Sequence, residues 1–143
     1  DEAVADGSLA RNPAIQGAMR VGREGALHLV GLVGEGGVHA SQRHLMALLD
    51  IARAEGVSRV VVHALTDGRD TRPDSALAAV AEIEAAGTKV GTVCGRYYAM
   101  DRDRRWERTR RAYDAMVHGA GERRRNAREA VQRLMAEGAL TAS

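Results

Sequence analysis

The sequence predicts an α/β fold: a three-layer α/β/α arrangement around a mainly parallel sheet. Three short runs rich in aliphatic and β-branched residues predict the strands, at 27–33 (LHLVGLV), 59–65 (RVVVHAL) and 89–93 (KVGTV). Helical patterns separate them, and the runs are spaced by about one βαβ unit. Strands that alternate with helices in this way require right-handed crossovers, which place helices on both faces of the sheet.

The helices follow from their capping residues and apolar spacing. Asn12 and Pro13 form a cap and first-turn pair for a helix that runs to about Arg23. Ser41 can cap the next helix, and Gly56 is placed to end it in a left-handed conformation. Its predicted apolar face consists of Leu45, Leu48, Leu49 and Ala52.

Three more helices are predicted in the second half of the chain. One opens at Pro73-Asp74-Ser75 and stops at Gly87, with one side made of Leu77, Val80, Ala81 and Glu84. Another stops at Gly119, and these residues recur in it at helical spacing: Trp106, Thr109, Tyr113, Met116 and Val117. A packing helix spans 122–137, with one face made of Ala127, Ala130, Val131, Leu134 and Met135.

Length and composition indicate a folded globular protein. A chain of 143 residues with 45% hydrophobic and 28% charged residues fits one domain, 1–143, with a substantial core. All but one of its 21 lysine and arginine residues are arginine, yet the formal net charge is only +2, so overall charge is weak evidence for a nucleic-acid partner. The single cysteine, Cys94, excludes an internal disulfide and favours a reducing compartment. Without a run of 18 apolar residues or a signal-peptide pattern, we expect a soluble cytoplasmic protein with no membrane partner.

Three polar clusters each follow a predicted strand, at 34–40, 66–74 and 94–103. In a parallel α/β sheet, ligands bind outside the carboxyl ends of the strands, where such loops converge. Arginines that are distant in sequence should therefore gather in one crevice that holds an anion.

The candidate site residues are arginines, carboxylates and one histidine. Arg69, Arg96 and Arg102 offer planar forks for phosphate or carboxylate; each alone reads best as a surface arginine, but their shared position favours an anion site. The carboxylates among these cations should stay ionised, one as a general base toward a sugar-like hydroxyl and the others as caps or arginine partners: Asp67, Asp70, Asp101 and Asp103. His39 follows a double glycine near a helix start and is a candidate phosphate donor.

Other chemistry has little support. His28 and His63 lie within apolar strands and are interpreted as satisfied core residues, with no cysteine or carboxylate at metal-ligand spacing beside them. Cys94 is interpreted as a buried filler. The segment 34–37 (GEGG) is neither a dinucleotide fingerprint nor a P-loop.

A small basic nucleic-acid-binding α/β module is the alternative function. Tyr97 and Tyr98 beside Arg96 could stack on bases, and the arginine-rich stretch 102–111 could follow a phosphate backbone. The carboxylates in the same stretch weaken the positive field.

Taken in order, the clusters resemble one family, the cofactor-independent (2,3-bisphosphoglycerate-independent) phosphoglycerate mutases. The matching segments are GLVGEGGVHA at 31–40, VVVHALTDGRDTRPDSAL at 60–77 and GTVCGRYYAMDRDRRWERTRRAYDAMVHGAG at 91–121, with DGSLARNPAI at 6–15 as a flank. The resemblance covers roughly 1–121, and GRYYAMDRD together with TDGRD is its most specific part.

The resemblance implies an isomerase of glycolysis and gluconeogenesis that interconverts 3-phosphoglycerate and 2-phosphoglycerate without 2,3-bisphosphoglycerate. Family members join a metal-bearing domain of alkaline-phosphatase type, with a serine nucleophile and two manganese ions, to an inserted α/β phosphotransferase domain that grips the substrate. This chain resembles the inserted domain alone, with 122–143 as the possible start of the return linker. The resemblance implies a monomeric full-length protein, and we expect the isolated chain to be inactive, to contain no metal site and to bind no nucleic acid.

Carried over by resemblance, five residues match family positions that contact the phosphoglycerate: His39, Arg69, Asp70, Arg96 and Arg102. Asp70 is the expected catalytic residue, which holds and deprotonates the glycerate hydroxyl that receives the phosphoryl group. One departure is Gly34-Glu35, where the family commonly has Ser-Asp.

Overall fold

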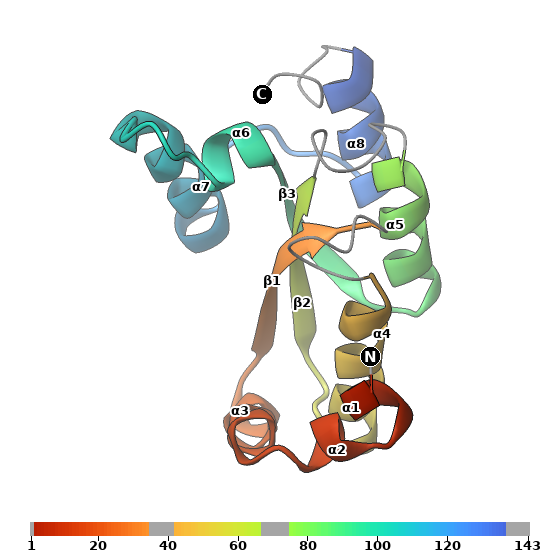
Figure 1. Ribbon diagram of the computed structural model, residues 1–143. Coiled ribbons are helices and arrows are strands. Elements are labelled where there is room, and N and C mark those ends of the chain that lie inside the picture. The colour runs from red at the N-terminus through yellow and green to blue at the C-terminus, as the bar shows by residue number, and fades with distance from the viewer. Residues whose placement is uncertain (1, 35–41, 67–74, 137–143) are drawn as a thin grey trace.

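The computed structural model describes residues 2–34, 42–66 and 75–136 (Figure 1). Along the chain the elements are α1 (Glu2–Ala5), α2 (Ser8–Arg11), α3 (Pro13–Glu24), β1 (Leu27–Val33), α4 (Gln42–Ala54), β2 (Val60–Thr66), α5 (Ser75–Ala85), β3 (Lys89–Gly95), α6 (Arg96–Ala99), α7 (Trp106–His118) and α8 (Ala127–Ala136). Among these elements, no helix is long and apolar enough to cross a membrane.

The described strands form a three-stranded parallel sheet in the order β1-β2-β3, which confirms the predicted α/β fold. Strand β1 was predicted with its observed bounds, β2 is shifted by one residue, and β3 continues two residues further, to Gly95. The register of β2 with β3 is interrupted between Val62 and His63, so that Val62 pairs with Val90 and His63 with Thr92. Gly91 lies at this irregularity.

The main core lies between the sheet and helices α4, α5 and α8, which Figure 1 shows together on one side of it. Strand β2 is central and the most buried, as expected for a parallel strand covered by crossover helices. The buried members of this cluster are Val33, Leu49, Val62, Ala64, Ala76, Ala79, Val80, Ile83, Ala127 and Val131.

Helix α3 lies at the amino end of the sheet and closes a second, smaller core of Met19, Leu27, Ala52 and Val57 (Figure 1). Its start was predicted correctly. The Asn12 side-chain oxygen accepts hydrogen bonds from the backbone N–H groups of Ala14 (2.9 Å) and Ile15 (3.3 Å), two donors that the first helical turn leaves without partners.

Helix α5 buries a different face from the predicted one. Its buried residues are Ala76, Ala79, Val80 and Ile83, so of the predicted set only Val80 is fully buried. The helix is almost uniformly apolar, which leaves little periodicity to read. Glu84 has another role, since its Oε1 accepts the Ala127 N–H at 2.7 Å and satisfies a donor at the start of α8.

The helix predicted from the spacing of Trp106, Tyr113 and Val117 is confirmed as α7, but these side chains do not form a core face. Trp106, Tyr113 and Val117 are 72%, 52% and 55% exposed, and only Ala112 of this helix is buried. In Figure 1, α6 and α7 project from the carboxyl end of β3, away from the layer formed by α4, α5 and α8. The predicted stop at Gly119 is confirmed, since Gly119 has the left-handed φ of 66°.

Helix α8 begins later than predicted, at Ala127 in place of 122. Asn126 precedes it, and its side-chain oxygen accepts the Glu129 N–H at 2.9 Å. The predicted face is confirmed, because Ala127 and Val131 are buried and Leu134 and Met135 pack against the main core. The proposed caps Ser41, Pro73 and Asp74 lie outside the described residues.

Candidate functional site

The carboxyl ends of the three strands lie side by side. Val33 pairs with Thr66, and Thr66 pairs with Gly95, so β1, β2 and β3 end at one edge of the sheet. The sequence continues from these ends into the three polar clusters. Of the predicted site residues, Arg96 and Arg102 belong to the described part, whereas His39, Arg69 and Asp70, together with the candidate Asp67, lie outside the described residues.

Arg96 is the first residue of α6, directly after β3. Gly95 at the helix start has extended backbone angles (φ −70°, ψ 147°), and one helical turn later the Met100 N–H donates to the Arg96 carbonyl at 2.8 Å. The Arg96 side chain is only partly exposed. Because Arg96 directly follows β3, it lies at the edge of the sheet where ligands of parallel α/β folds bind.

Arg102 lies in the loop between α6 and α7. It is exposed, and it makes no hydrogen bond or ion pair with any residue that the structure describes. A guanidinium carries five N–H donors in a fixed fork. Arg102 can therefore offer a bidentate contact to an incoming phosphate or carboxylate.

Asp101 joins this loop to the start of α7. Its side chain is 2% exposed, its Oδ2 accepts the Arg105 N–H at 2.8 Å, and its Oδ1 accepts from Arg108 Nη1 at 3.1 Å. The carboxylates were considered as helix caps or as partners of arginines. Asp101 has both roles, since it accepts a backbone N–H next to the start of α7 and pairs with Arg108. The more exposed Asp103 lies 3.6 Å from the same Arg108 nitrogen.

Arginines from α7 cover both tyrosines of α6. The Arg108 guanidinium carbon lies 3.9 Å from the centroid of the Tyr97 ring. That of Arg111 lies 4.6 Å from the Tyr98 centroid, and Arg111 Nη1 donates to the Tyr98 hydroxyl at 3.3 Å. The two rings meet edge to face with centroids 5.1 Å apart. These rings pack the loop, which disfavours a base-stacking platform.

Sequence reasoning missed Arg108 as a functional candidate. It was one of many arginines between 102 and 111, and its charge alone did not distinguish it. The signal that could have found it is spacing, since Arg108 and Arg111 are three residues apart and share one face of a helix. In the alternative nucleic-acid hypothesis the stretch 102–111 could follow a phosphate backbone, whereas Arg108 and Arg111 contact the tyrosines of α6.

Gly34 and Gln42, the described residues on either side of the segment 35–41, are hydrogen-bonded to each other, and sequence reasoning also missed Gln42. Gln42 is 2% exposed, and its Oε1 accepts the Gly34 N–H at 3.1 Å while its own N–H donates to the Gly34 carbonyl at 3.1 Å. Its Nε2 donates to the Ala79 carbonyl at 3.0 Å. A buried amide with both ends bonded fixes the two residues that bracket the segment containing His39.

Two histidines and a threonine form a hydrogen-bonded row across the sheet. His28 Nδ1 lies 2.8 Å from His63 Nε2, and His63 Nδ1 lies 2.9 Å from Thr92 Oγ1. His63 is buried, as predicted, whereas His28 is exposed, so its interpretation as a core residue was wrong. Burial, and secondarily the adjacent His28, lower the pKa of His63. Among the described residues no group of three or more His, Cys, Asp or Glu side chains could hold a metal ion.

Two further polar groups lie near the strand ends. Cys94 is half-buried, so it is less enclosed than the predicted buried filler, and burial still raises the pKa of its thiol, against a smaller opposing effect of Arg111. The hydroxyl oxygen of Thr66 is buried at the end of β2 and has no hydrogen-bond partner within the described residues.

Comparison with known proteins identifies the family. Residues 1–140 match the family described as "BPG-independent PGAM N-terminus". The chain is 52% identical to the 2,3-bisphosphoglycerate-independent phosphoglycerate mutase of Thermomicrobium roseum and 45% identical to that of Clostridioides difficile, each alignment covering 96% of this chain and 28% of the relative. A crystal structure of Leishmania mexicana phosphoglycerate mutase at low cobalt concentration matches with a TM-score of 0.81 and 29% identity, over 96% of this chain and 27% of that one.

The chain thus spans little more than a quarter of the length of these relatives. Its fold, its sequence and its matched segment agree with one another. It belongs to the BPG-independent phosphoglycerate mutase family and corresponds to part of the family's N-terminal region.

Proposed function

We propose that this chain is the substrate-binding domain of a phosphoglycerate mutase that interconverts 3-phosphoglycerate and 2-phosphoglycerate. The names of the relatives support the reaction, and the match to only 28% of their length supports a division of labour with the rest of the enzyme. We assign residues 1–143 to one domain and propose that 122–143, a range that includes α8, starts the return linker to the rest of the enzyme.

The observation that carries the proposal is the exposed Arg102 in the loop that follows β3 and α6, beside Asp101, whose side chain is buried and accepts two hydrogen bonds. Arg102 would bind the phosphate or carboxylate through its fork, and Arg96 would contribute from the start of α6. We propose His39, Arg69 and Asp70 as the remaining contacts. Their segments follow the adjacent ends of β1 and β2.

In this mechanism the chain retains and orients the glycerate. A phosphoserine on the other domain would donate the phosphoryl group, and Asp70 would hold and deprotonate the accepting hydroxyl. Holding the glycerate between domains raises its effective concentration for the return transfer and keeps water from the phosphoserine. Two divalent ions, manganese by family resemblance, would belong to that other domain and stabilise the charge on the phosphoryl group. We infer a monomeric enzyme that needs no 2,3-bisphosphoglycerate.

Titration of the chain with 3-phosphoglycerate, followed by backbone NMR shifts, tests the site. The backbone signals that change on addition of 3-phosphoglycerate should be those of residues near 39, 69–70 and 95–102. Arg102→Ala should weaken binding by on the order of 1.5–3 kcal/mol, the contribution of a hydrogen bond to a charged group. Arg128→Ala, which removes an exposed arginine from α8, is the control and should bind as the wild type does. Shifts confined to α8 or to the amino end of the sheet would contradict the site.

The comparisons give the nucleic-acid alternative no support, because the relatives carry the name of a mutase. Any binding to DNA should be weak, dependent on salt and independent of sequence. Tight, sequence-selective binding at physiological salt would reopen it.

A further inference from the structure

We propose that Asp101 and Arg108 are positioning residues that hold the loop between α6 and α7 in the shape that presents Arg102 to the substrate. The inference rests on the proposed function, since it concerns the same site. Neither residue is assigned a contact with the substrate.

Asp101 is placed to act within the protein only. With 2% of its side chain exposed and each oxygen accepting one hydrogen bond, it offers little surface to a ligand. A free carboxylate would also repel a phosphate. Here Arg108 provides a compensating charge at 3.1 Å, so Asp101 can lie beside an anion site without opposing it.

Arg108 connects three parts of the structure. It extends from α7, its guanidinium covers the Tyr97 ring of α6 at 3.9 Å, and its Nη1 donates to Asp101 in the loop. Its side chain is only 16% exposed, so these contacts are largely shielded from water. An ion pair that is fully exposed to water would contribute little.

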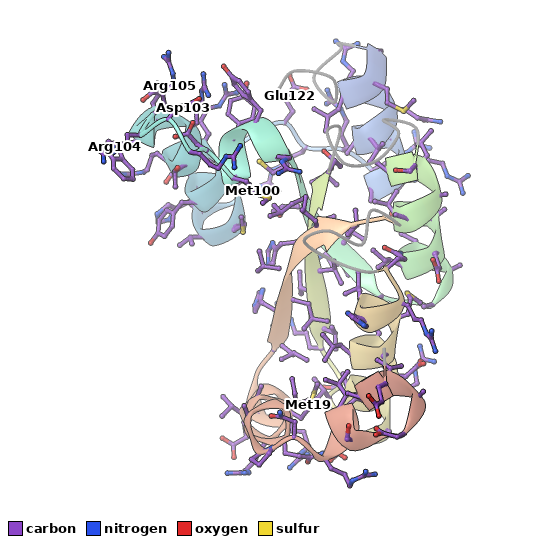
Figure 2. All side chains as sticks on the ribbon, in the orientation of Figure 1. Met19, Met100, Asp103, Arg104, Arg105 and Glu122 are labelled. Carbon is purple, nitrogen blue, oxygen red and sulfur yellow. The ribbon has the colours of Figure 1, made fainter. Side chains whose placement is uncertain are left out.

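The loop requires such support because it contains a strained residue. Arg104 has a φ of 57°, the only positive φ of a non-glycine residue in the described part of the chain. That conformation is strained for an L-residue and persists where surrounding contacts impose it. Figure 2 shows Asp103, Arg104 and Arg105 together at the outer tip of the loop, with Met100 back toward the sheet. The hydrogen bond from the Arg105 N–H to Asp101 adjoins this strained residue.

The functional consequence is preorganisation. A flexible arginine loses conformational freedom when a ligand immobilises it, and that loss weakens binding. If the loop is already fixed, that cost is met during folding and Arg102 binds more tightly. Loosening the loop should therefore weaken binding through Arg102 and through no other contact.

Asp101→Asn is the variant that tests this idea. The amide oxygen can still accept the Arg105 N–H, but the charge that holds Arg108 is lost. Binding of 3-phosphoglycerate should weaken about 10-fold, within the range expected when a side chain must be ordered on binding. Asp114→Asn is the matched control, since Asp114 pairs with Arg110 on the solvent side of α7 at 2.9 Å, and it should change affinity less than about 2-fold.

Combining variants separates positioning from general damage. In the Arg102→Ala background, Asp101→Asn should cause almost no further loss of affinity, because coupled residues are non-additive. Additive losses would overturn the proposal. Arg108→Lys keeps a cation for Asp101 but removes the planar stack on Tyr97, and it should show the same non-additivity. It also provides a second test if Asp101→Asn folds poorly.

A readout without ligand separates this inference from the proposed function. In ¹⁵N relaxation, backbone order parameters of 100–105 should be near about 0.85 in the wild type and fall toward about 0.6 in Asp101→Asn, but stay unchanged in Asp114→Asn. Unchanged order parameters in Asp101→Asn would overturn the positioning role, whatever the binding result. If Arg102→Ala leaves 3-phosphoglycerate binding intact while the loop loosens as expected, the proposed site is wrong and the positioning role for substrate binding fails with it.

Discussion

Gly34 and Gln42 are joined by two reciprocal hydrogen bonds, from the Gly34 N–H to Gln42 Oε1 and from the Gln42 N–H to the Gly34 carbonyl, each 3.1 Å long. Because Gln42 Nε2 also donates to the Ala79 carbonyl, one buried amide connects β1, α4 and α5. Replacing the Gln42 side chain leaves the buried Gly34 N–H without a hydrogen bond, and an unpaired buried group costs more than the bond itself contributes.

Gln42→Leu should therefore lower the free energy of unfolding by about 2 kcal/mol, within the range for leaving a buried polar group unsatisfied. Gln132→Leu, on the exposed side of α8, is the matched control and should change it by less than about 0.5 kcal/mol. Urea unfolding followed by circular dichroism measures both. Equal effects of the two substitutions would show that the Gln42 bonds add no net stability.

Local signals predicted most of the fold. The Asn12 cap, the glycine stop at Gly119 and the aliphatic runs of the strands depend on neighbours in sequence, and the structure confirms them. The face of α7 was not predictable in this way. Trp106 and Tyr113 have the spacing of a core stripe, but what covers a helix depends on the elements around it, and here they are exposed.

The sequence predicts where the candidate site lies better than it predicts which side chains within the site contact one another. Placing Arg96 and Arg102 after β3 needed only the order of strands and loops. The pairing of Asp101 with Arg108 needed the shape of a loop that contains Arg104 with a positive φ, and sequence spacing does not predict such a shape. The roles of His39, Arg69 and Asp70 stay predictions.

The His28 and His63 pair should make stability depend on pH. Burial and the neighbouring His28 lower the pKa of His63, so below its ordinary pKa of about 6.5 the unfolded chain binds a proton more readily than the fold does. The contribution of His63 to stability is therefore present above about pH 6.5 and is lost as the pH falls through and below that value.

Urea midpoints measured across this pH range test the expectation. The wild type should lose stability on acidification, and His63→Gln should flatten that dependence. His118→Gln removes an exposed imidazole from the end of α7 and should keep the wild-type dependence. A pH dependence that survives in His63→Gln would assign it to another group.

Gly91→Ala should destabilise the sheet at the register irregularity of β3. A Cβ at this position would lie 2.5 Å from Val61 Cγ1, a contact that requires a side chain or strand to shift. The expected loss is about 1–3 kcal/mol, the usual cost of overpacking.

Gly31→Ala in β1 is the matched control, because its Cβ would meet no atom within 4 Å. It should leave stability unchanged or raise it by up to about 1 kcal/mol, since alanine restricts the unfolded chain. Thermal unfolding of the two variants side by side gives the comparison. Two equally stable variants would mean that Val61 rotates away without cost.

The last prediction concerns catalysis. The purified chain with manganese should not interconvert 3-phosphoglycerate and 2-phosphoglycerate, because the proposed mechanism takes its serine nucleophile and metal ions from a part of the enzyme outside this sequence. A coupled mutase assay checks this, beside a full-length mutase that carries residues 1–143 in place of its own matching segment.

In that full-length enzyme Asp70→Asn should lower turnover by about 100-fold or more, as when a positioned acid or base is removed, with a small change in KM. Asp114→Asn, far along α7, should leave turnover unchanged. Metal-dependent turnover by the isolated chain would refute the division of labour, and near-normal turnover of the Asp70 variant would restrict that carboxylate to holding the substrate.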